Sequence, residues 1–142
     1  RPQREVPTMR LFITPIMVVT TVFLAACAAS AEIARDNEVT PHEAYNRQAQ
    51  GVAVIVDVRT VREYQTAHID GAVNIPLSDV TARAQELLHL VGEREVILYC
   101  RSGRRAGIAE TLLRERGVLN ILHLNGQLAG WVAEGLPVNQ DS

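Results

Sequence analysis

The sequence contains no lysine, so arginine provides every fixed positive charge on the chain. The net charge is −2, and this slightly negative balance gives no support for nucleic acid as a partner. The chain also lacks internal repeats and low-complexity tracts, which excludes a repeat architecture. A length of 142 residues with ordinary hydrophobic content therefore predicts one globular domain that is large enough to bury a core.

The N-terminal part of the chain has the composition of an export signal. Met9 and Arg10 precede the apolar run LFITPIMVVTTVFLAA, which carries no charge. This run is too short, and too interrupted by threonine and proline, for a transmembrane helix, but it has the length of the hydrophobic region of a signal peptide. We therefore interpret residues 1–31 as a signal-peptide region, with Met9 as the start and residues 1–8 as an upstream over-read.

The apolar run ends in LAAC, residues 24–27, which resembles the lipobox of bacterial lipoproteins. In that family the cysteine becomes the lipid-modified first residue. The resemblance therefore implies a lipid anchor on Cys27 and an exported protein of the periplasm or cell envelope. Ordinary secretory cleavage after Ala31 is the alternative, because Ala29-Ser30-Ala31 has the small-x-small pattern. We favour lipidation because a cysteine is otherwise unusual at this place.

Cysteine is scarce, and both routes of processing leave Cys100 as the single available thiol. Lipidation occupies Cys27 and cleavage after Ala31 removes it, so the exported domain cannot form an internal disulfide. Loss of residues 1–26 also removes three arginines and one glutamate, which changes the net charge from −2 to about −4. An exported protein that keeps one cysteine is expected to use it.

We place a single domain at residues 39–138, between a linker at 32–38 and a C-terminal tail at 139–142. Continuous apolar runs such as VAVIVDV are typical of strands that are buried on both faces of a sheet. Four segments are expected to form strands, at residues 52–58, 71–76, 96–100 and 118–124.

Helices are expected between these strands. Thr40 and Thr60 each begin a capping-box pattern, with a glutamate three residues later. Ser78 is expected to cap the next helix, and residues 106–116 are helical by composition. Because strands and helices alternate, the sequence predicts an α/β domain with a largely parallel sheet and helices on both faces.

The segment YCRSGRR, residues 99–105, places Cys100 at the end of a predicted strand and one short loop before a helix. Ligands of such sheets bind at the carboxyl ends of the strands, against helix N-termini. Helix N-termini and nearby cations favour the thiolate form of a cysteine. Gly103 permits a tight turn in which backbone N–H groups point inward. Three arginines supply the cations, namely Arg101, Arg104 and Arg105.

A purely structural explanation of this segment is a core cysteine followed by a solvated helix start. However, positive charge at a helix N-terminus opposes the helix dipole, so three arginines are unfavourable there unless an anion neutralises them. This cost favours a functional site, in which Ser102 can add a hydroxyl donor. We expect no metal and no organic cofactor, because the histidines at positions 42, 89 and 123 are scattered without metal-ligand spacing.

Three motifs, in order along the chain, resemble those of the rhodanese family. They are DVRTVREYQTAHIDGAVNIP at 57–76, YCRSGRRA at 99–106 and LNGQLAGWVAEGLPV at 124–138. The resemblance covers residues 39–138, and small single-domain exported bacterial members are nearest in layout. It implies a parallel five-stranded sheet with flanking helices. One departure is Asn125-Gly126 in place of the usual Gly-Gly, where asparagine tolerates positive φ.

The resemblance also implies an activity, which is sulfur transfer through a persulfide on Cys100. The donor would be a small anion such as thiosulfate, bound by residues 101–105, and the acceptor a thiol or cyanide. Two alternatives are a non-catalytic sulfur carrier and a redox sensor with an exposed thiol. A third is a cysteine phosphatase or arsenate reductase. The loop is C-x4-R, and Ala106 stands where a C-x5-R phosphatase loop needs arginine, so we expect sulfur transfer.

Four further polar residues in the first motif have simpler explanations than catalysis. Arg59 and Glu63 are four residues apart and are expected to pair with each other. Asp57 is expected to accept backbone donors in the following turn, and His68 to make a structural hydrogen bond. A thiolate that is already ionised by its loop needs no general base.

The lipobox-like segment leads to a first testable prediction. Labelled fatty acid is expected to enter the wild-type protein and not the variant Cys27→Ala, because the thiol is the site of acylation. Metabolic labelling of the exported protein measures this directly. An unlipidated mature chain that begins at Glu32 would instead demonstrate ordinary secretory cleavage.

Overall fold

The structure is a computed structural model, and it describes residues 37–140. The predicted signal-peptide region, the lipobox-like segment with Cys27, and linker residues 32–36 lie outside the described residues. Within residues 37–140, none of the helices has the length and apolar character that crossing a membrane requires.

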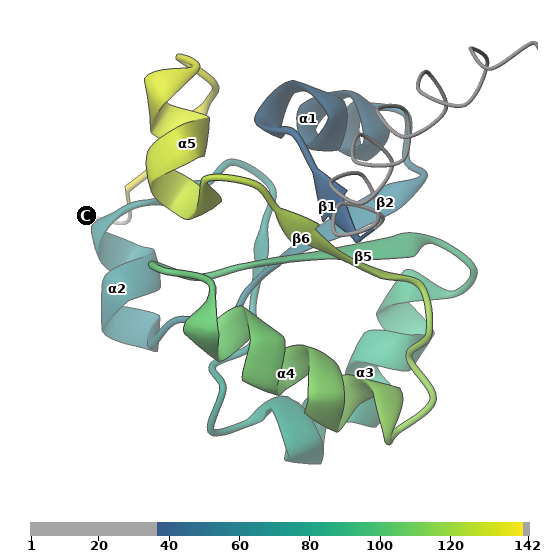
Figure 1. Ribbon diagram of the computed structural model, residues 1–142. Coiled ribbons are helices and arrows are strands. Elements are labelled where there is room, and N and C mark those ends of the chain that lie inside the picture. Colours follow the sequence, from purple (N-terminus) through teal and green to yellow (C-terminus); the bar gives the residue numbers. More distant parts are fainter. Residues whose placement is uncertain (1–36, 141–142) are drawn as a thin grey trace, which may run out of the picture. The chain divides into compact units, whose positions relative to one another are not determined.

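A parallel sheet of five strands forms the centre of the domain, in the order β1-β6-β5-β2-β4 (Figure 1). This confirms the predicted α/β architecture with a five-stranded sheet. The strands of this sheet are β1 (Glu38–Val39), β2 (Ala53–Asp57), β4 (Val73–Asn74), β5 (Glu95–Tyr99) and β6 (Ile121–Leu124). The described helices are α1 (Pro41–Ala49), α2 (Val61–Thr66), α3 (Val80–Val91), α4 (Arg104–Arg114) and α5 (Gln127–Ala133).

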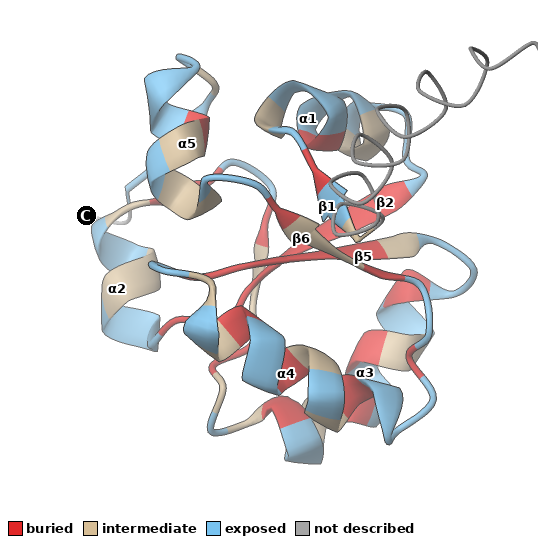
Figure 2. Ribbon diagram, in the orientation of Figure 1, coloured by how far each residue is buried: buried red, intermediate tan, exposed pale blue. Residues whose placement is uncertain are grey.

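The two faces of the sheet are covered by different helices. Figure 1 shows α1 and α5 on one side of the sheet and α3 and α4 on the other. Alternate residues of the central strands divide between two cores, so that Val96 and Leu98 face α3 and α4 while Ile97 and Tyr99 face α1 and α5. Both sets are fully buried, as Figure 2 shows for β5. The continuous apolar runs of the sequence follow from this double burial.

Local sequence signals account for most of the helix boundaries. Both predicted capping boxes are present, with Thr40 and Thr60 as N-caps of α1 and α2. The prediction that Ser78 caps α3 is wrong, because α3 begins at Val80 and its N-cap is Asp79, which makes no side-chain capping bond. The Ser78 hydroxyl instead donates to the Asp79 carboxylate at 2.8 Å.

Two short pairings at the ends of the domain were not predicted. Glu38, which the sequence suggested was part of a linker, pairs with His123 in the sheet. Asn139, which was expected in the tail, belongs to β7 (Val138–Asn139), which pairs antiparallel with β3 (His68–Ile69). These pairings join residues that are far apart in sequence, so local patterns carry no signal for them.

The order of the strands brings three loops together at one edge of the sheet. In parallel strands all carboxyl ends point the same way, and α2, α4 and α5 each follow such an end, of β2, β5 and β6 respectively. Asp57 and Tyr99 are register partners as the last residues of neighbouring strands. The cysteine loop after β5 therefore lies between the segments that follow β2 and β6, as the crevice rule for such sheets predicts.

Candidate active site

Cys100 lies directly after β5, one residue beyond the end of the strand, and its loop leads into α4 at Arg104. The predicted start of this helix at residue 106 is therefore two residues late. The helix begins early because Gly103, with φ of 87°, is its N-cap in a left-handed conformation that other residues adopt only with strain. As a result Arg104 and Arg105 lie within the first turn of α4.

The thiol of Cys100 is held inside this loop. The backbone N–H of Gly103 donates a hydrogen bond to Cys100 Sγ over 3.0 Å. Cys100 is fully buried and packs against the core on the α3–α4 side of the sheet. The redox-sensor alternative assumed an exposed thiol, whereas Cys100 is covered in the structure. The sulfur is therefore a buried atom that accepts a backbone hydrogen bond at the N-terminus of α4.

The three arginines of the loop have different surroundings. Arg105 forms a bidentate ion pair with Glu63 of α2, with N–O distances of 2.6 and 2.8 Å. Arg101 and Arg104 are exposed, and neither has a hydrogen bond or ion pair to any described residue. Among the described residues, Glu63 thus neutralises one of the three arginines that were predicted to bind the substrate, and the other two remain available to an external anion. The role of Arg105 as a substrate ligand stays a prediction.

The expected pairing of Arg59 with Glu63 is wrong, because both residues have other partners. The hydrogen bond from Arg105 lowers the pKa of Glu63 to about 2, and Thr60 contributes through the capping box. The same contact with Glu63 raises the pKa of Arg105. This pair connects α2 to the first turn of α4, although the two residues are 42 positions apart in sequence.

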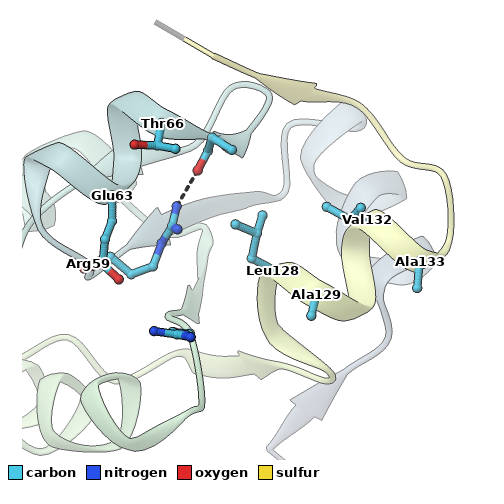
Figure 3. Close-up of a pocket in the computed structure, with 9 residues that line it drawn as sticks. Arg59, Glu63, Thr66, Leu128, Ala129, Val132 and Ala133 are labelled. Carbon is cyan, nitrogen blue, oxygen red and sulfur yellow. Dashed lines mark hydrogen bonds between the residues drawn. The ribbon is translucent and has the colours of Figure 1, made fainter.

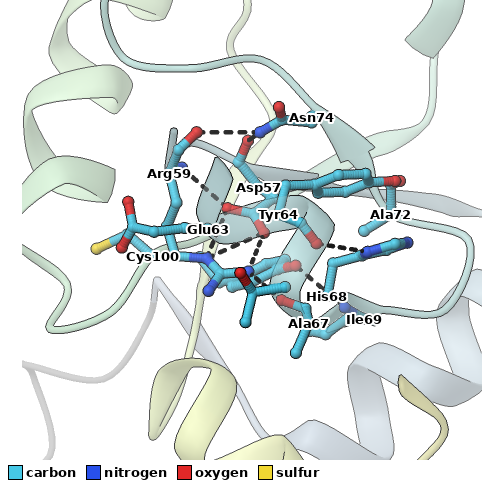
Figure 4. A network of polar contacts seen from close by, with 12 residues as sticks. Asp57, Arg59, Glu63, Tyr64, Ala67, His68, Ile69, Ala72, Asn74 and Cys100 are labelled. Atoms are coloured by element: carbon cyan, nitrogen blue, oxygen red, sulfur yellow. Dashed lines mark hydrogen bonds and ion pairs between the residues drawn. The ribbon is translucent and has the colours of Figure 1, made fainter. Parts of the chain in front are cut away.

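Arg59 instead forms a buried ion pair with Asp57 (Figure 4). Its Nη2 donates to Asp57 Oδ2 at 2.6 Å and also to the carbonyl of Ala67 at 2.6 Å. The Arg59 backbone N–H donates to Asp57 Oδ1 at 2.9 Å, which confirms the prediction that Asp57 accepts a backbone donor from its turn. The guanidinium carbon lies 5.6 Å from the ring centre of Tyr99, within reach of a cation–π contact.

His68 has the structural role that the sequence suggested. Its Nδ1 lies 2.8 Å from the carbonyl oxygen of Tyr64 and donates to it, because a carbonyl can only accept. The imidazole is stacked on the Tyr64 ring, with 3.7 Å between ring centres. These contacts connect β3 to α2, and nothing in them connects the imidazole to the thiol.

Gln127, at the start of α5, is a residue of the site that the sequence reasoning missed. Its Oε1 accepts a hydrogen bond of 2.8 Å from the backbone N–H of Cys100, and its Nε2 donates to the carbonyl of Leu124 at 2.7 Å. The side chain therefore holds the cysteine loop against the end of β6. A contact between residues 27 positions apart leaves no local pattern in the sequence.

The expected turn at Asn125-Gly126 is present. Gly126 and Gln127 have φ of 72° and 55°, whereas Asn125 is not in the left-handed region. The turn therefore does not need the tolerance of asparagine for positive φ. Gln127 is the single described residue other than glycine with positive φ. Such a conformation costs free energy and persists only where surrounding contacts impose it, which here are the two hydrogen bonds of its side chain.

Comparison with known proteins identifies this arrangement. A family model described as Rhodanese-like domain matches residues 40–134, which is more than half of the chain. The chain belongs to the rhodanese-like domain family. The crystal structure of the Alr3790 protein from Anabaena has the same fold, with a TM-score of 0.65 at 31% identity, over 72% of this chain and 91% of that one.

Curated relatives of this rhodanese-like domain differ in length. A protein named sulfurtransferase from Allochromatium vinosum is 32% identical over 103 residues, which cover 72% of this chain and 94% of the relative. The HTH-type transcriptional regulator Rv0324 from Mycobacterium tuberculosis is 34% identical over 119 residues, which cover 82% of this chain and 51% of the relative. The chain thus spans about half the length of several curated relatives that it matches.

The Glu63–Arg105 pair leads to a prediction about pH. Because the pKa of Glu63 is lowered in the folded protein from 4.5 to about 2, the pair stabilises the fold above pH 4.5 and loses this contribution as the pH falls toward 2. Glu63→Gln keeps a side chain that can form the capping box. We expect it to lower the free energy of unfolding by roughly 1 kcal/mol at neutral pH, since the pair is partly exposed.

Urea unfolding of both proteins across this pH range measures the effect. The difference between wild type and Glu63→Gln is expected to close below pH 4.5. Glu86→Gln is the matched control, because Glu86 pairs with Arg83 on the surface of a single helix, and its effect should be smaller. A difference for Glu63→Gln that stays constant with pH would contradict the assignment.

The Gln127 contact leads to a second prediction. Gln127→Leu leaves the backbone N–H of buried Cys100 without an acceptor, so we expect a loss of about 1–3 kcal/mol in the free energy of unfolding. We also expect faster hydrogen exchange at the Cys100 amide, which NMR measures. Gln48→Leu is the control, because the Gln48 amide bonds the carbonyl of Asp70 at the surface. Equal effects of the two substitutions would show that Gln127 does not hold the loop.

Proposed function

We propose that this rhodanese-like domain transfers sulfane sulfur from a thiosulfate-like donor to a thiophilic acceptor, through a persulfide on Cys100. Membership of the family and the name of the relative from Allochromatium vinosum support sulfur transfer in general. The thiosulfate donor and the persulfide are the finer part of the proposal. The observation that carries this part is the hydrogen bond of 3.0 Å from the Gly103 N–H to Cys100 Sγ.

That hydrogen bond supports a sulfur anion at Sγ in both steps of the reaction. The Cys100 thiolate attacks the outer sulfur of thiosulfate, the sulfur–sulfur bond of the donor breaks, and sulfite leaves with the electron pair. An acceptor thiolate or cyanide then attacks the outer sulfur of the persulfide and releases the Cys100 thiolate. A covalent intermediate divides one transfer into two easier displacements, and a preorganised N–H stabilises the charge at each.

The charge of the donor accounts for the two arginines without partners. Thiosulfate is a dianion, and Arg101 lies within the Cys100–Gly103 turn while Arg104 directly follows it. Charge-assisted hydrogen bonds from guanidinium groups are among the strongest in proteins. Ser102 is exposed and can add a hydroxyl donor. An anion bound here also offsets the unfavourable contact between the arginines and the positive end of the α4 dipole.

The burial of Cys100 adds one requirement to the proposal. Because the thiol is fully covered, the donor reaches Sγ only when side chains around the loop move aside. Arg101, Ser102 and Arg104 are exposed and have room to do so. Gly103 and Arg105 are less exposed, and Arg105 is held by Glu63.

The length of the loop argues against phosphatase or arsenate chemistry. A C-x5-R loop would need an arginine at position 106, where Ala106 is fully buried in the core against α3 and the sheet. The arginine one residue earlier, Arg105, is directed to Glu63. A loop of this length is one residue too short to surround a tetrahedral phosphate, whereas the terminal sulfur of a donor can approach Sγ once the covering side chains have moved aside.

We expect the purified domain to form thiocyanate from thiosulfate and cyanide. Mass spectrometry after thiosulfate alone should show a gain of one sulfur atom on the peptide that contains Cys100. Cys100→Ser should fold normally and abolish both signals, because it removes the nucleophile. Hydrolysis of p-nitrophenyl phosphate should be negligible in the same preparation.

Arginine variants test the role of charge in donor binding. Arg104→Ala is expected to raise the thiosulfate concentration for half-maximal persulfide formation about tenfold, the equivalent of one charged hydrogen bond. Arg116→Ala removes the same charge beyond the far end of α4 and is the control.

Phosphatase turnover that depends on Cys100, without a persulfide, would reverse the assignment of sulfur transfer. Thiosulfate binding without any turnover would indicate a sulfur carrier or sensor.

A further inference from the structure

A pocket of about 620 Å³ lies beside the cysteine loop (Figure 3). One wall comes from α5 and the other from α2 and the loop itself. The residues that line it are Arg59, Glu63, Thr66, Ala67, Arg101, Leu128, Ala129, Val132 and Ala133. Its volume lies within the range of about 300–1,000 Å³ that is usual for sites of small molecules.

The α5 wall of this pocket is apolar and only partly covered by the protein. It consists of Leu128, Ala129, Val132 and Ala133, and Figure 3 shows Leu128 directed from α5 toward the side chain of Arg59. Val132 is 53% exposed, although it is a large hydrophobic residue in the last turn of α5. An apolar ligand that covers this wall would be stabilised by the area that it removes from water.

The opposite wall carries one charge that the protein does not neutralise. Arg59 is paired with Asp57, and Glu63 is paired with Arg105. Arg101 is exposed and has no hydrogen bond or ion pair to a described residue. The lining therefore presents an apolar surface on one side and an available guanidinium group on the other. This combination is complementary to a ligand with an apolar body and a carboxylate.

Both walls are connected directly to the reactive cysteine. Arg101 is the next residue after Cys100, and Leu128 is the next residue after Gln127, whose side chain accepts the Cys100 N–H at 2.8 Å. The pocket thus adjoins the nucleophile from two sides of its backbone. Cys100 is not itself among the lining residues, so a molecule that is bound here lies beside the cysteine loop and meets a sulfur on Cys100 only when the side chains that cover Sγ move aside.

We propose that this pocket binds the sulfur acceptor and that the acceptor is a small organic thiol with an apolar chain and a carboxylate. This inference rests on the proposed function. The acceptor thiolate attacks the outer sulfur of the Cys100 persulfide, a new sulfur–sulfur bond forms on the acceptor, and the Cys100 thiolate leaves with the electrons of the broken bond. No oxidant or reductant is required.

Single-turnover transfer to three synthetic thiols tests the class of acceptor. The protein is first converted to the persulfide with thiosulfate, and loss of the extra sulfur is then followed by mass spectrometry. Mercaptohexanoate has its thiol and carboxylate at opposite ends of an apolar chain. Mercaptohexylamine reverses the charge and mercaptoacetate removes the chain. At low concentration we expect mercaptohexanoate to react about tenfold faster than either of the other two thiols. The amine lacks the contact between carboxylate and guanidinium, and mercaptoacetate lacks the apolar contact.

Variants of the two walls then locate the preference. Val132→Asp places a negative charge on the apolar wall, where the apolar chain of mercaptohexanoate is expected to lie. It should lower the ratio of the mercaptohexanoate rate to the mercaptoacetate rate about tenfold. Leu119→Asp is the matched control, because Leu119 is 67% exposed and lies outside this pocket. Arg101→Gln should abolish the advantage of mercaptohexanoate over mercaptohexylamine. Equal reactivity of the three thiols, or equal effects of Val132→Asp and Leu119→Asp, would overturn the inference.

Binding of hexanoate to Cys100→Ser separates this inference from the proposed function. Hexanoate has no thiol, so NMR shifts of the Leu128 and Val132 methyl groups report the pocket without any sulfur transfer. If no persulfide forms on the wild-type protein, the proposed function fails. The pocket would still be supported as a site for apolar carboxylates if hexanoate shifts the Leu128 methyl signals and Val132→Asp abolishes this shift. Absence of these shifts would overturn the pocket assignment. Transfer to a protein thiol and to none of the small thiols would show that the acceptor is a protein.

Discussion

The ion pair between Asp57 and Arg59 is buried at the carboxyl end of β2, with side-chain exposures of 0% and 8%. Removing a charge from water costs several kcal/mol, so such a pair is stable only when nearly all of its hydrogen-bonding groups have partners. Here those partners are side chains and backbone carbonyls of neighbouring segments of the same domain. Arg59 donates to Asp57 and to the carbonyl of Ala67, and Asn74 donates to the carbonyls of both Asp57 and Arg59. The segment from β2 to β4, with α2 inside it, is thereby fixed against the sheet.

The position of α2 then determines the electrostatics of the cysteine loop. Because α2 is fixed, Glu63 faces the first turn of α4 and neutralises Arg105. On the other side, Gln127 of α5 holds the backbone of Cys100. The loop is thus supported by one ion pair and one hydrogen bond from two different helices. Arg101 and Arg104 form no hydrogen bond or ion pair with a described residue. Which of the three similar arginines is neutralised is therefore decided by the neighbours that the fold gives each of them.

Several features could be predicted because their causes are local. Thr40 and Thr60 cap helices through glutamates three residues away, and Gly103 permits a turn that depends on its own φ. The strands around Ile55 and Ile97 are apolar except for one terminal residue each because the sheet is covered on both faces. Two of the errors also have local causes. Ser78 and Asp79 are both good capping residues. Arg59 is four residues before Glu63, but it precedes the N-cap Thr60, so the spacing rule for helix faces does not apply to this pair.

The sequence by itself determined the α/β fold, the three-motif resemblance to the rhodanese family, and the place of Cys100 between a buried strand and a helix. These follow from apolar runs, capping patterns and glycines, whose effects extend over only a few residues. Only the tertiary structure decided that Arg105 is neutralised while Arg101 and Arg104 have no partner among the described residues, that Gln127 supports the loop, and that an apolar pocket adjoins it. The physical reason is that charge neutralisation and burial depend on distant partners, such as Glu63 at 42 residues from Arg105, which parallel strand order brings to one edge of the sheet.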